Sequence, residues 1–176
     1  MKRTLRSNVS VLGALTRGAV AGAVGTAAMD PVWFARHKRQ GGEQGVWTWE
    51  TSEGLDSWED ASAPGQVGRR VLRSACRRDP ADRWARVTTN VMHWAYGLAW
   101  GAQYGIVLRS TKRSAPTWGL VLGPVVWMSD YVVLPLAKVY KPMWDYDAKT
   151  LWKDLSAHLV HGGVTGGAFA AMLGRR

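Results

Sequence analysis

The sequence predicts an all-α protein: an integral membrane four-helix bundle with a long, partly helical outer connection between the first two helices. The chain has 176 residues, and four of its segments are long and nearly free of charge. About 20 residues, each rising about 1.5 Å, cross the roughly 30 Å hydrocarbon core of a bilayer. Half of the charged residues lie outside these segments, between residues 36 and 86. The 11 tryptophans also fit a membrane protein, because Trp is enriched at membrane–water interfaces.

We therefore expect a single membrane domain over residues 1–176. Its spans cover about residues 12–35, 87–108, 115–137 and 155–174, with a polar, interfacial connection at 36–86. The last span is the clearest, because LSAHLVHGGVTGGAFAAMLG carries no formal charge and is bounded by charged residues on both sides. Its two histidines, His158 and His161, are three residues apart and share one helix face.

The first span carries small residues that allow a second helix to approach. Gly18, Gly22 and Gly25 recur through GAVAGAVGTAAM, a face suited to packing against the glycines of the last span. Asp30 precedes Pro31, which lacks a backbone donor, so we expect Asp30 at a kink or near the end of the helix. The basic start of the chain resembles a signal peptide, but Arg17 interrupts the apolar run and favours a retained first helix.

The connection between the first two spans divides into an acidic part and a basic part. The acidic part holds Trp47, Trp49 and Trp58, which is typical of an interfacial segment. Further on, residues 66–76 place Val71 and other apolar residues on one face and arginines on the other. This pattern predicts a short amphipathic helix that lies on the membrane surface.

The distribution of positive charge predicts how the protein is oriented. The net charge is +10, and with four spans the two ends of the chain and the 109–114 hairpin carry basic residues without acidic ones. Short segments with an excess of Lys and Arg stay in the cytoplasm, so we expect both termini inside a bacterial plasma membrane. The density of arginines in residues 69–86 argues for the opposite orientation.

Other features of the sequence exclude several classes of function. The basic residues lie beside apolar spans and no nucleic-acid motif occurs, so we expect membrane lipid as a partner and no nucleic acid. The one cysteine, Cys76, excludes an intrachain disulfide and a thiolate zinc site. No nucleotide-binding loop, nucleophile elbow or zinc-protease helix is present, so no catalytic residue is predicted and an enzyme is not favoured.

Five ionisable residues fall at a similar depth of the predicted spans. They are Asp30, His93, Asp130, His158 and His161. Counted at about 1.5 Å per residue, all five lie within ~6–12 Å of the same outer boundary. Ionisable groups inside a bilayer are costly and tend to face the bundle interior. We therefore predict one buried cluster of carboxylates and imidazoles in the outer half of the membrane.

The residue types leave four uses of this cluster open. It could be a purely structural hydrogen-bond network between helices. Its five members could be ligands of zinc or another divalent transition metal. Its histidines could carry protons or cations, because imidazole titrates near neutral pH. A haem could bind as a cofactor between His93 and His161 on facing helices.

The function predicted from the sequence is a small polytopic membrane protein whose His/Asp cluster binds a cation or a proton. One alternative is an accessory or structural subunit of a larger membrane protein complex, consistent with small size, glycine-rich faces and many tryptophans. Another is a haem-binding electron-transfer membrane protein. The expected assembly is a homo-oligomer or a larger membrane protein complex, and a monodisperse homo-oligomer would count against the accessory subunit.

Three stretches carry a resemblance to known families: WTWE…SWEDASAPGQVGRRV, NVMHWAYGLAWGAQYG and YKPMWDYDAKTLWKDLSAHLVHG. Together they resemble a group of uncharacterised actinobacterial membrane proteins over most of residues 45–165. The layout is more distantly similar to the YagU-like bacterial inner-membrane proteins, which also have four predicted spans, an Asn/His-bearing second span and a Gly-His in the last. The resemblance implies a bacterial plasma-membrane location and assigns no catalytic residue.

Overall fold

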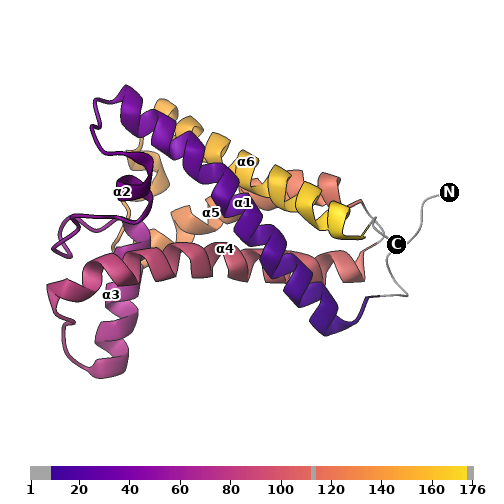
Figure 1. The fold of residues 1–176 in the computed structure, drawn as a ribbon, viewed down its shortest axis with the longest axis horizontal. Helices are drawn as coiled ribbons and strands as arrows, with labels where there is room; N and C mark the ends of the chain where they lie inside the picture. Colours follow the sequence, from indigo (N-terminus) through magenta and orange to yellow (C-terminus); the bar gives the residue numbers. More distant parts are fainter. Residues whose placement is uncertain (1–8, 112–113, 174–176) are drawn as a thin grey trace. The chain divides into compact units, whose positions relative to one another are not determined.

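The computed structural model describes residues 9–111 and 114–173, and within these it is all-helical, without strands. This confirms the predicted all-α class. Figure 1 shows the helices in chain order. They are α1 (Val11–Arg39), α2 (Val46–Glu50), α3 (Ala63–Cys76), η2 (Asp82–Trp84), α4 (Ala85–Ser110), α5 (Ala115–Leu136), η3 (Met143–Asp145) and α6 (Ala148–Leu173).

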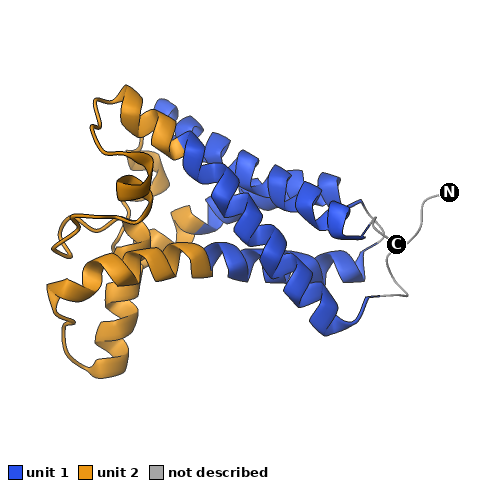
Figure 2. Cartoon of the chain, in the orientation of Figure 1, with its two compact units in different colours: residues 1–32, 96–129, 147–176 blue, residues 33–95, 130–146 orange. Residues whose placement is uncertain are grey.

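The chain forms two compact units (Figure 2). Unit 1 comprises residues 1–32, 96–129 and 147–176, and unit 2 comprises residues 33–95 and 130–146. Unit 1 therefore contains most of α1 and α5, the second half of α4 and all of α6. Unit 2 contains the long connection predicted from the sequence together with the adjoining ends of α1, α4 and α5.

In unit 1, α1 packs against α4 through glycines. A Cβ atom on Gly18 would overlap the carbonyl oxygen of Gly101, and one on Gly22 would overlap that of Gly97. Rising residue numbers on α1 thus face falling numbers on α4, so the two helices run antiparallel. Backbones this close leave no room for a side chain, which is the small-residue packing expected between membrane helices.

The α5 and α6 helices repeat this arrangement. A Cβ atom on Gly119 would lie 2.6 Å from the carbonyl oxygen of Gly162, and one on Gly123 would overlap that of His158. This pair is antiparallel for the same reason. The glycine face of the first span was predicted to pack against the glycines of the last span. One member of that face, Gly25, does approach α6, at Thr165 and His161. Gly18 and Gly22 face α4 instead, and Gly162 of the last span faces α5.

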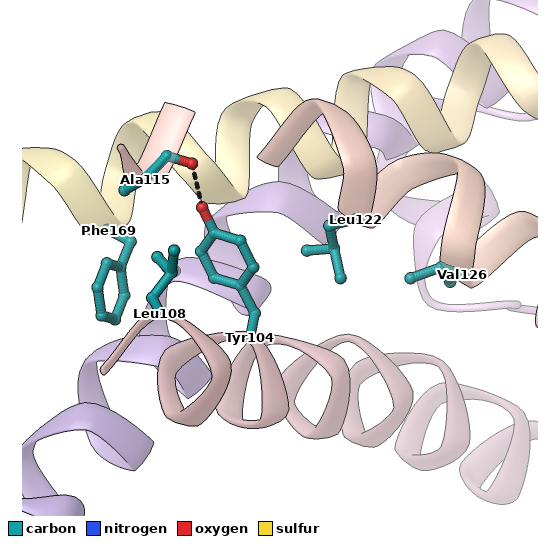
Figure 3. Packing of buried hydrophobic residues seen from close by; sticks show 7 residues of the cluster. Tyr104, Leu108, Ala115, Leu122, Val126 and Phe169 are labelled. Carbon is teal, nitrogen blue, oxygen red and sulfur yellow. Dashed lines mark hydrogen bonds between the residues drawn. The ribbon is translucent and has the colours of Figure 1, made fainter. Parts of the chain in front are cut away.

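A small apolar cluster joins the helices of unit 1 (Figure 3). Its buried members include Tyr104, Leu108, Leu122, Val126 and Phe169. The Tyr104 hydroxyl donates to the carbonyl oxygen of Ala115 at the start of α5, and its ring lies edge-on to Phe169 of α6, with 5.7 Å between ring centroids. Tyr104 therefore links three helices through one side chain.

Two of the four predicted spans, α1 and α5, are long and apolar enough to cross a membrane by length and composition. Core helices of soluble proteins and signal sequences can have the same length and composition. The other two, α4 and α6, do not reach this level of apolarity, because their histidines, amides and aromatic rings lower it. The four-span prediction is thus confirmed only as far as two helices able to span.

Helix boundaries differ from the prediction where local polar contacts decide them. The α6 helix begins at Ala148, seven residues before the predicted span, because the Asp147 carboxylate accepts hydrogen bonds from the Thr150 N–H (2.9 Å) and hydroxyl (2.7 Å). This is the side-chain capping that helix starts require. The α1 helix continues past Pro31 to Arg39, so Asp30 does not end it.

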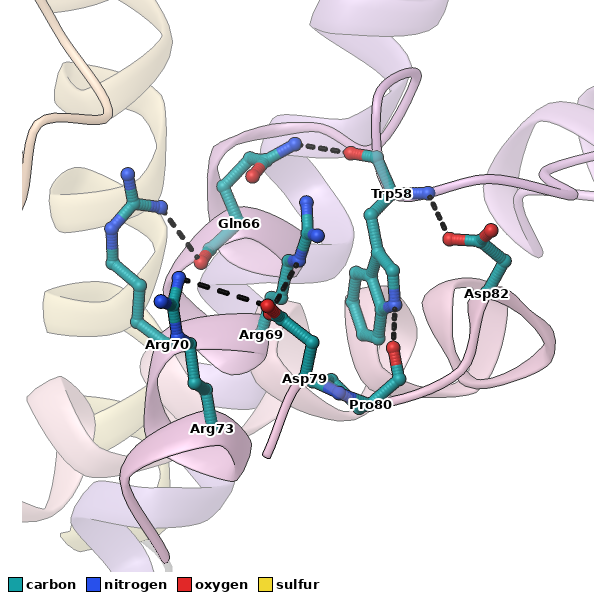
Figure 4. Close-up of polar contacts among 8 residues, drawn as sticks. All are labelled: Trp58, Gln66, Arg69, Arg70, Arg73, Asp79, Pro80 and Asp82. Atoms are coloured by element: carbon teal, nitrogen blue, oxygen red, sulfur yellow. Dashed lines mark hydrogen bonds and ion pairs between the residues drawn. The ribbon is translucent and has the colours of Figure 1, made fainter. Parts of the chain in front are cut away.

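Trp58 forms the core of unit 2 (Figure 4). Its side chain is only 1% exposed, and its indole N–H donates to the carbonyl oxygen of Pro80 at 2.8 Å. Its backbone N–H donates to Asp82 at 3.3 Å, and Gln66 donates to its carbonyl oxygen. Sequence reasoning placed Trp58 in an interfacial segment and did not foresee its burial, because its partners Pro80 and Asp82 lie more than 20 residues further along the chain.

The α3 helix packs on α4 through glycines. A Cβ atom on Gly65 would overlap the Thr89 hydroxyl, and one on Gly68 would overlap the Thr88 methyl group. Val71, on the predicted apolar face, is exposed. The predicted amphipathic helix therefore exists as α3. Its contact with α4 is made by small residues, and Val71 of its apolar face takes no part in it.

Ion pairs close the end of α3. Arg69 and Arg73 both contact the Asp79 carboxylate, at 3.5 Å and 3.8 Å, as Figure 4 shows. The guanidinium of Arg69 also lies 5.9 Å from the centre of the Trp58 ring. Exposed ion pairs of this kind each contribute little, so we assign most of the stability of unit 2 to the buried tryptophan.

Candidate functional site

The five predicted site residues are divided between the two units. Asp30, His158 and His161 belong to unit 1, and His93 and Asp130 belong to unit 2. The structure therefore presents two sets of ionisable groups, and the prediction of one shared cluster stays a prediction.

The unit 1 set is buried within the helices. Asp30 is 6% exposed, His158 is 8% exposed and His161 is 3% exposed. Asp30 comes from α1 and both histidines come from α6. Imidazole and carboxylate are groups that can hold a proton or a cation. In the described part of the chain, however, these three residues do not form a group of three metal-ligating atoms.

His158 is oriented by the helix turn before it. Its Nδ1 atom lies 2.9 Å from the backbone carbonyl oxygen of Asp154 and 3.7 Å from an oxygen of the Asp154 carboxylate. The close approach of α5 at Gly123 brings a second helix against the His158 backbone. Asp154, which the sequence analysis treated only as a boundary of the span, is thus a carboxylate partner of this imidazole.

His161 lies where α1 approaches α6. A Cβ atom on Gly25 would be 3.1 Å from the His161 Nδ1 atom, so the absence of a side chain on α1 makes room for this ring. The Thr165 hydroxyl donates to the His161 carbonyl oxygen at 2.7 Å. His161 therefore lies in a helix–helix interface, which agrees with the expectation that ionisable groups face the bundle interior.

In unit 2, His93 lies beside a carboxylate that the sequence analysis missed. A carboxylate oxygen of Glu50 and a ring nitrogen of His93 lie within 4.8 Å of each other, and both residues are half-buried. Carboxylate oxygen and imidazole nitrogen are both common metal ligands. The two residues are far apart in the sequence, and only the placement of α2 against α4 pairs them.

The residue after Glu50 fixes this placement. The Thr51 carbonyl oxygen accepts hydrogen bonds from the Arg86 guanidinium and the Asn90 side-chain amide, both at 3.0 Å. Arg86, Asn90 and His93 recur at helical spacing and share one face of α4. The end of α2 is therefore fixed on the same face of α4 that carries His93.

The residue before Glu50 is held by the end of α1. The ring centroid of Trp49 lies 5.5 Å from that of Phe34 and 6.2 Å from that of His37. Glu50 thus sits between two residues with fixed contacts, and its backbone position is determined on both sides.

Asp130 is half-buried near the end of α5 and joins no group of three metal-ligating residues in the described part of the chain. Its neighbour Tyr131 packs against Tyr140 and Tyr146, with ring centroids 5.7 Å and 5.5 Å apart. The haem prediction stays untested, because His93 belongs to unit 2 and His161 to unit 1.

Comparisons with protein-family models, with curated proteins and with solved structures found no match to this chain. The resemblance to actinobacterial membrane proteins and to the YagU-like layout therefore stays a prediction, and the site has to be interpreted from its own residues.

Proposed function

We propose that this protein is a small helical protein of a bacterial plasma membrane whose buried carboxylates and imidazoles bind a cation or a proton. The observation that carries the proposal is the burial of three ionisable residues, Asp30, His158 and His161, on the helices of unit 1. Such groups are costly in an apolar environment, and inside membrane bundles they mark sites for ions or protons.

The surface of unit 1 supports a membrane location. Val20 and Leu120 are 53% and 61% exposed, and further large aliphatic residues are exposed on α1, α4 and α5. The contacts between the helices, by contrast, are made largely by glycine, alanine and threonine. Small residues inside and large aliphatic residues outside are what lipid as the solvent favours. A water-soluble bundle would bury its large aliphatic residues instead.

We propose further that all four long helices cross the membrane, with both termini in the cytoplasm. Cys76 is the only cysteine and is exposed, so it reports on the location of the long connection. A membrane-impermeant maleimide should label Cys76 in intact spheroplasts, and a Cys76→Ser variant should not be labelled. Labelling of Cys76 only after permeabilisation would contradict this orientation, and recovery of the protein without membranes would contradict the location.

Binding of an ion or proton can be followed through stability. For the purified full-length protein in detergent, we expect the thermal midpoint to respond to pH between about 5 and 8 or to added cations, because bound ligands stabilise the folded state. Asp30→Asn and His161→Gln should reduce this response, and Gln103→Ala, an exposed change on α4, should not. A midpoint that is insensitive to pH and to every cation tested would overturn the proposal.

A second candidate function is an accessory subunit of a membrane protein complex. It is favoured by two tryptophans of unit 2, Trp47 and Trp144, which are 77% and 84% exposed. Trp is enriched at protein–protein interfaces as well as at membrane surfaces. Stoichiometric partners that co-purify with the native chain, and are lost with Trp144→Ser, would favour this candidate.

A further inference from the structure

We propose that Glu50 and His93 bind a divalent transition-metal ion. This inference rests on the proposed function, which it deepens by naming one site in unit 2 and the class of cation that the site takes. Glu50 was not among the residues predicted from the sequence, and the pair exists only through the contact of α2 with α4.

The distance between the two groups suits a shared ion. Zinc–nitrogen and zinc–oxygen bonds are about 2.0–2.2 Å, so two ligand atoms on one tetrahedral ion lie roughly 3.4 Å apart. The Glu50 oxygen and the His93 nitrogen lie within 4.8 Å of each other. The pair is therefore close enough for a shared ion once the flexible glutamate side chain adjusts.

The backbone around the pair is already fixed. On one side of Glu50, Trp49 packs on Phe34 and His37, and on the other side the Thr51 carbonyl oxygen accepts from Arg86 and Asn90. A metal site needs its ligands oriented by surrounding contacts, since a loosely held ligand must be ordered when the ion binds. The main chain at Glu50 is already ordered before an ion binds, so metal binding costs little further conformational entropy there.

The donor atoms decide the class of ion. One imidazole nitrogen and one carboxylate oxygen suit zinc, manganese, cobalt, nickel or iron, whereas calcium and magnesium take oxygen ligands. Soft ions that require thiolates do not fit a pair without sulfur.

The test uses the full-length protein in detergent with Co²⁺ as a spectroscopic probe and Zn²⁺ as its competitor. We expect one Co²⁺ per chain, displaced by Zn²⁺, with visible d–d absorption from a site with nitrogen and oxygen ligands. Glu50→Gln and His93→Gln should each lower the Co²⁺ affinity by at least about tenfold. The matched control is Glu53→Gln, an exposed glutamate of the same connection, which should leave the affinity unchanged.

Other outcomes separate this inference from the proposed function. Co²⁺ binding that survives in folded Glu50→Gln and His93→Gln variants but is lost in His158→Gln overturns the Glu50–His93 site and leaves the proposed function standing. Absence of Co²⁺ binding together with a pH-dependent thermal midpoint also overturns the Glu50–His93 site and leaves the proposed function standing. Absence of Co²⁺ binding and of any pH response overturns the site and the proposed function together. If circular dichroism shows that a variant does not fold, the wild-type protein is used instead, and the His93 ring resonances are followed by NMR as Zn²⁺ is added. Resonances that do not shift overturn the site.

Discussion

The two units of this protein are stabilised by different means. In unit 1 the helices meet at their backbones, as at Gly18 against Gly101, and many large aliphatic side chains, such as Val20 and Leu120, are exposed outside a small buried cluster. In unit 2 the centre is a buried tryptophan, Trp58, whose indole and backbone groups are hydrogen-bonded to neighbouring loops. Both units have glycine contacts between helices, but unit 2 is centred on one large buried side chain, whereas close backbone contacts run through both helix pairs of unit 1.

The proposed membrane location would account for this difference, with lipid around unit 1 and water and lipid headgroups around unit 2. Lipid gives helices no hydrophobic reason to associate, so close van der Waals contact between small residues has to hold them together. Water and headgroups favour burial of a large aromatic ring and hydrogen bonds for its polar atom. The contrast predicts that the same kind of substitution will have different consequences in the two units.

The largest effect is expected at Trp58. Trp58→Ala removes the buried ring and should destabilise unit 2 by about 3–5 kcal/mol. Amide hydrogen exchange should accelerate in α3 and at the start of α4, while the α5 and α6 segments of unit 1 keep their protection. Equal acceleration throughout the chain would show that the two units do not differ in this way.

The next effect is expected at the glycine contact of α1 and α4. Gly101→Ala places a methyl group against the backbone of Gly18 and Gly22, so the helices have to separate. We expect a loss of about 1–3 kcal/mol in denaturant unfolding in detergent. Gly167→Ala is the matched control, because nothing lies within 4 Å of its Cβ position. It should be neutral or stabilising by up to about 1 kcal/mol.

A smaller effect is expected where α2 is fixed on α4. Asn90→Ala removes one of the two side-chain donors to the Thr51 carbonyl oxygen and should lower stability by about 1 kcal/mol. The same change should weaken Co²⁺ binding, measured by titration, because Glu50 becomes less well positioned. Gln103→Ala, which loses only a bond within its own helix, should change neither quantity.

The smallest effect concerns the start of α6. Hydrogen bonds from the Thr150 side chain and backbone lower the pKa of the Asp147 carboxyl from its ordinary value of 3.8. The ionised cap therefore stabilises the helix start above about pH 4, and this contribution is lost as pH falls through the lowered pKa. The amide protection factor at Thr150 should be higher at pH 7 than at pH 3. In Asp147→Ala the two values should be equal.

The helices could largely be predicted from the sequence, because long runs without charge and recurring glycines are local signals. The start of α6 was displaced because the hydrogen bonds of the Asp147 cap extended the helix through the polar residues before the span. The burial of Trp58 could not be predicted, because it depends on contacts with Pro80 and Asp82, which are distant in the sequence.

Within the candidate site, the burial of Asp30, His158 and His161 agrees with the expectation for ionisable residues in spans. Glu50 could not have been found in this way. Its position beside His93 depends on the Thr51 contact with α4, across about 40 residues, and no periodicity in the sequence encodes it. Only its place at the end of WTWE, next to a tryptophan pair, marked the segment as unusual.

The chain has four histidines, so its imidazoles can be followed individually by ¹⁵N NMR of histidine-labelled protein in detergent micelles. The measurement is a pH titration from about 5 to 8.5 with and without Zn²⁺, in which His37 serves as the internal reference. We predict that the ring nitrogens of His93 shift on addition of Zn²⁺ and that those of His158 or His161 respond to pH or to a cation. Buried imidazoles that keep one tautomer throughout and ignore every added ion would contradict the proposal that this protein binds a cation or a proton.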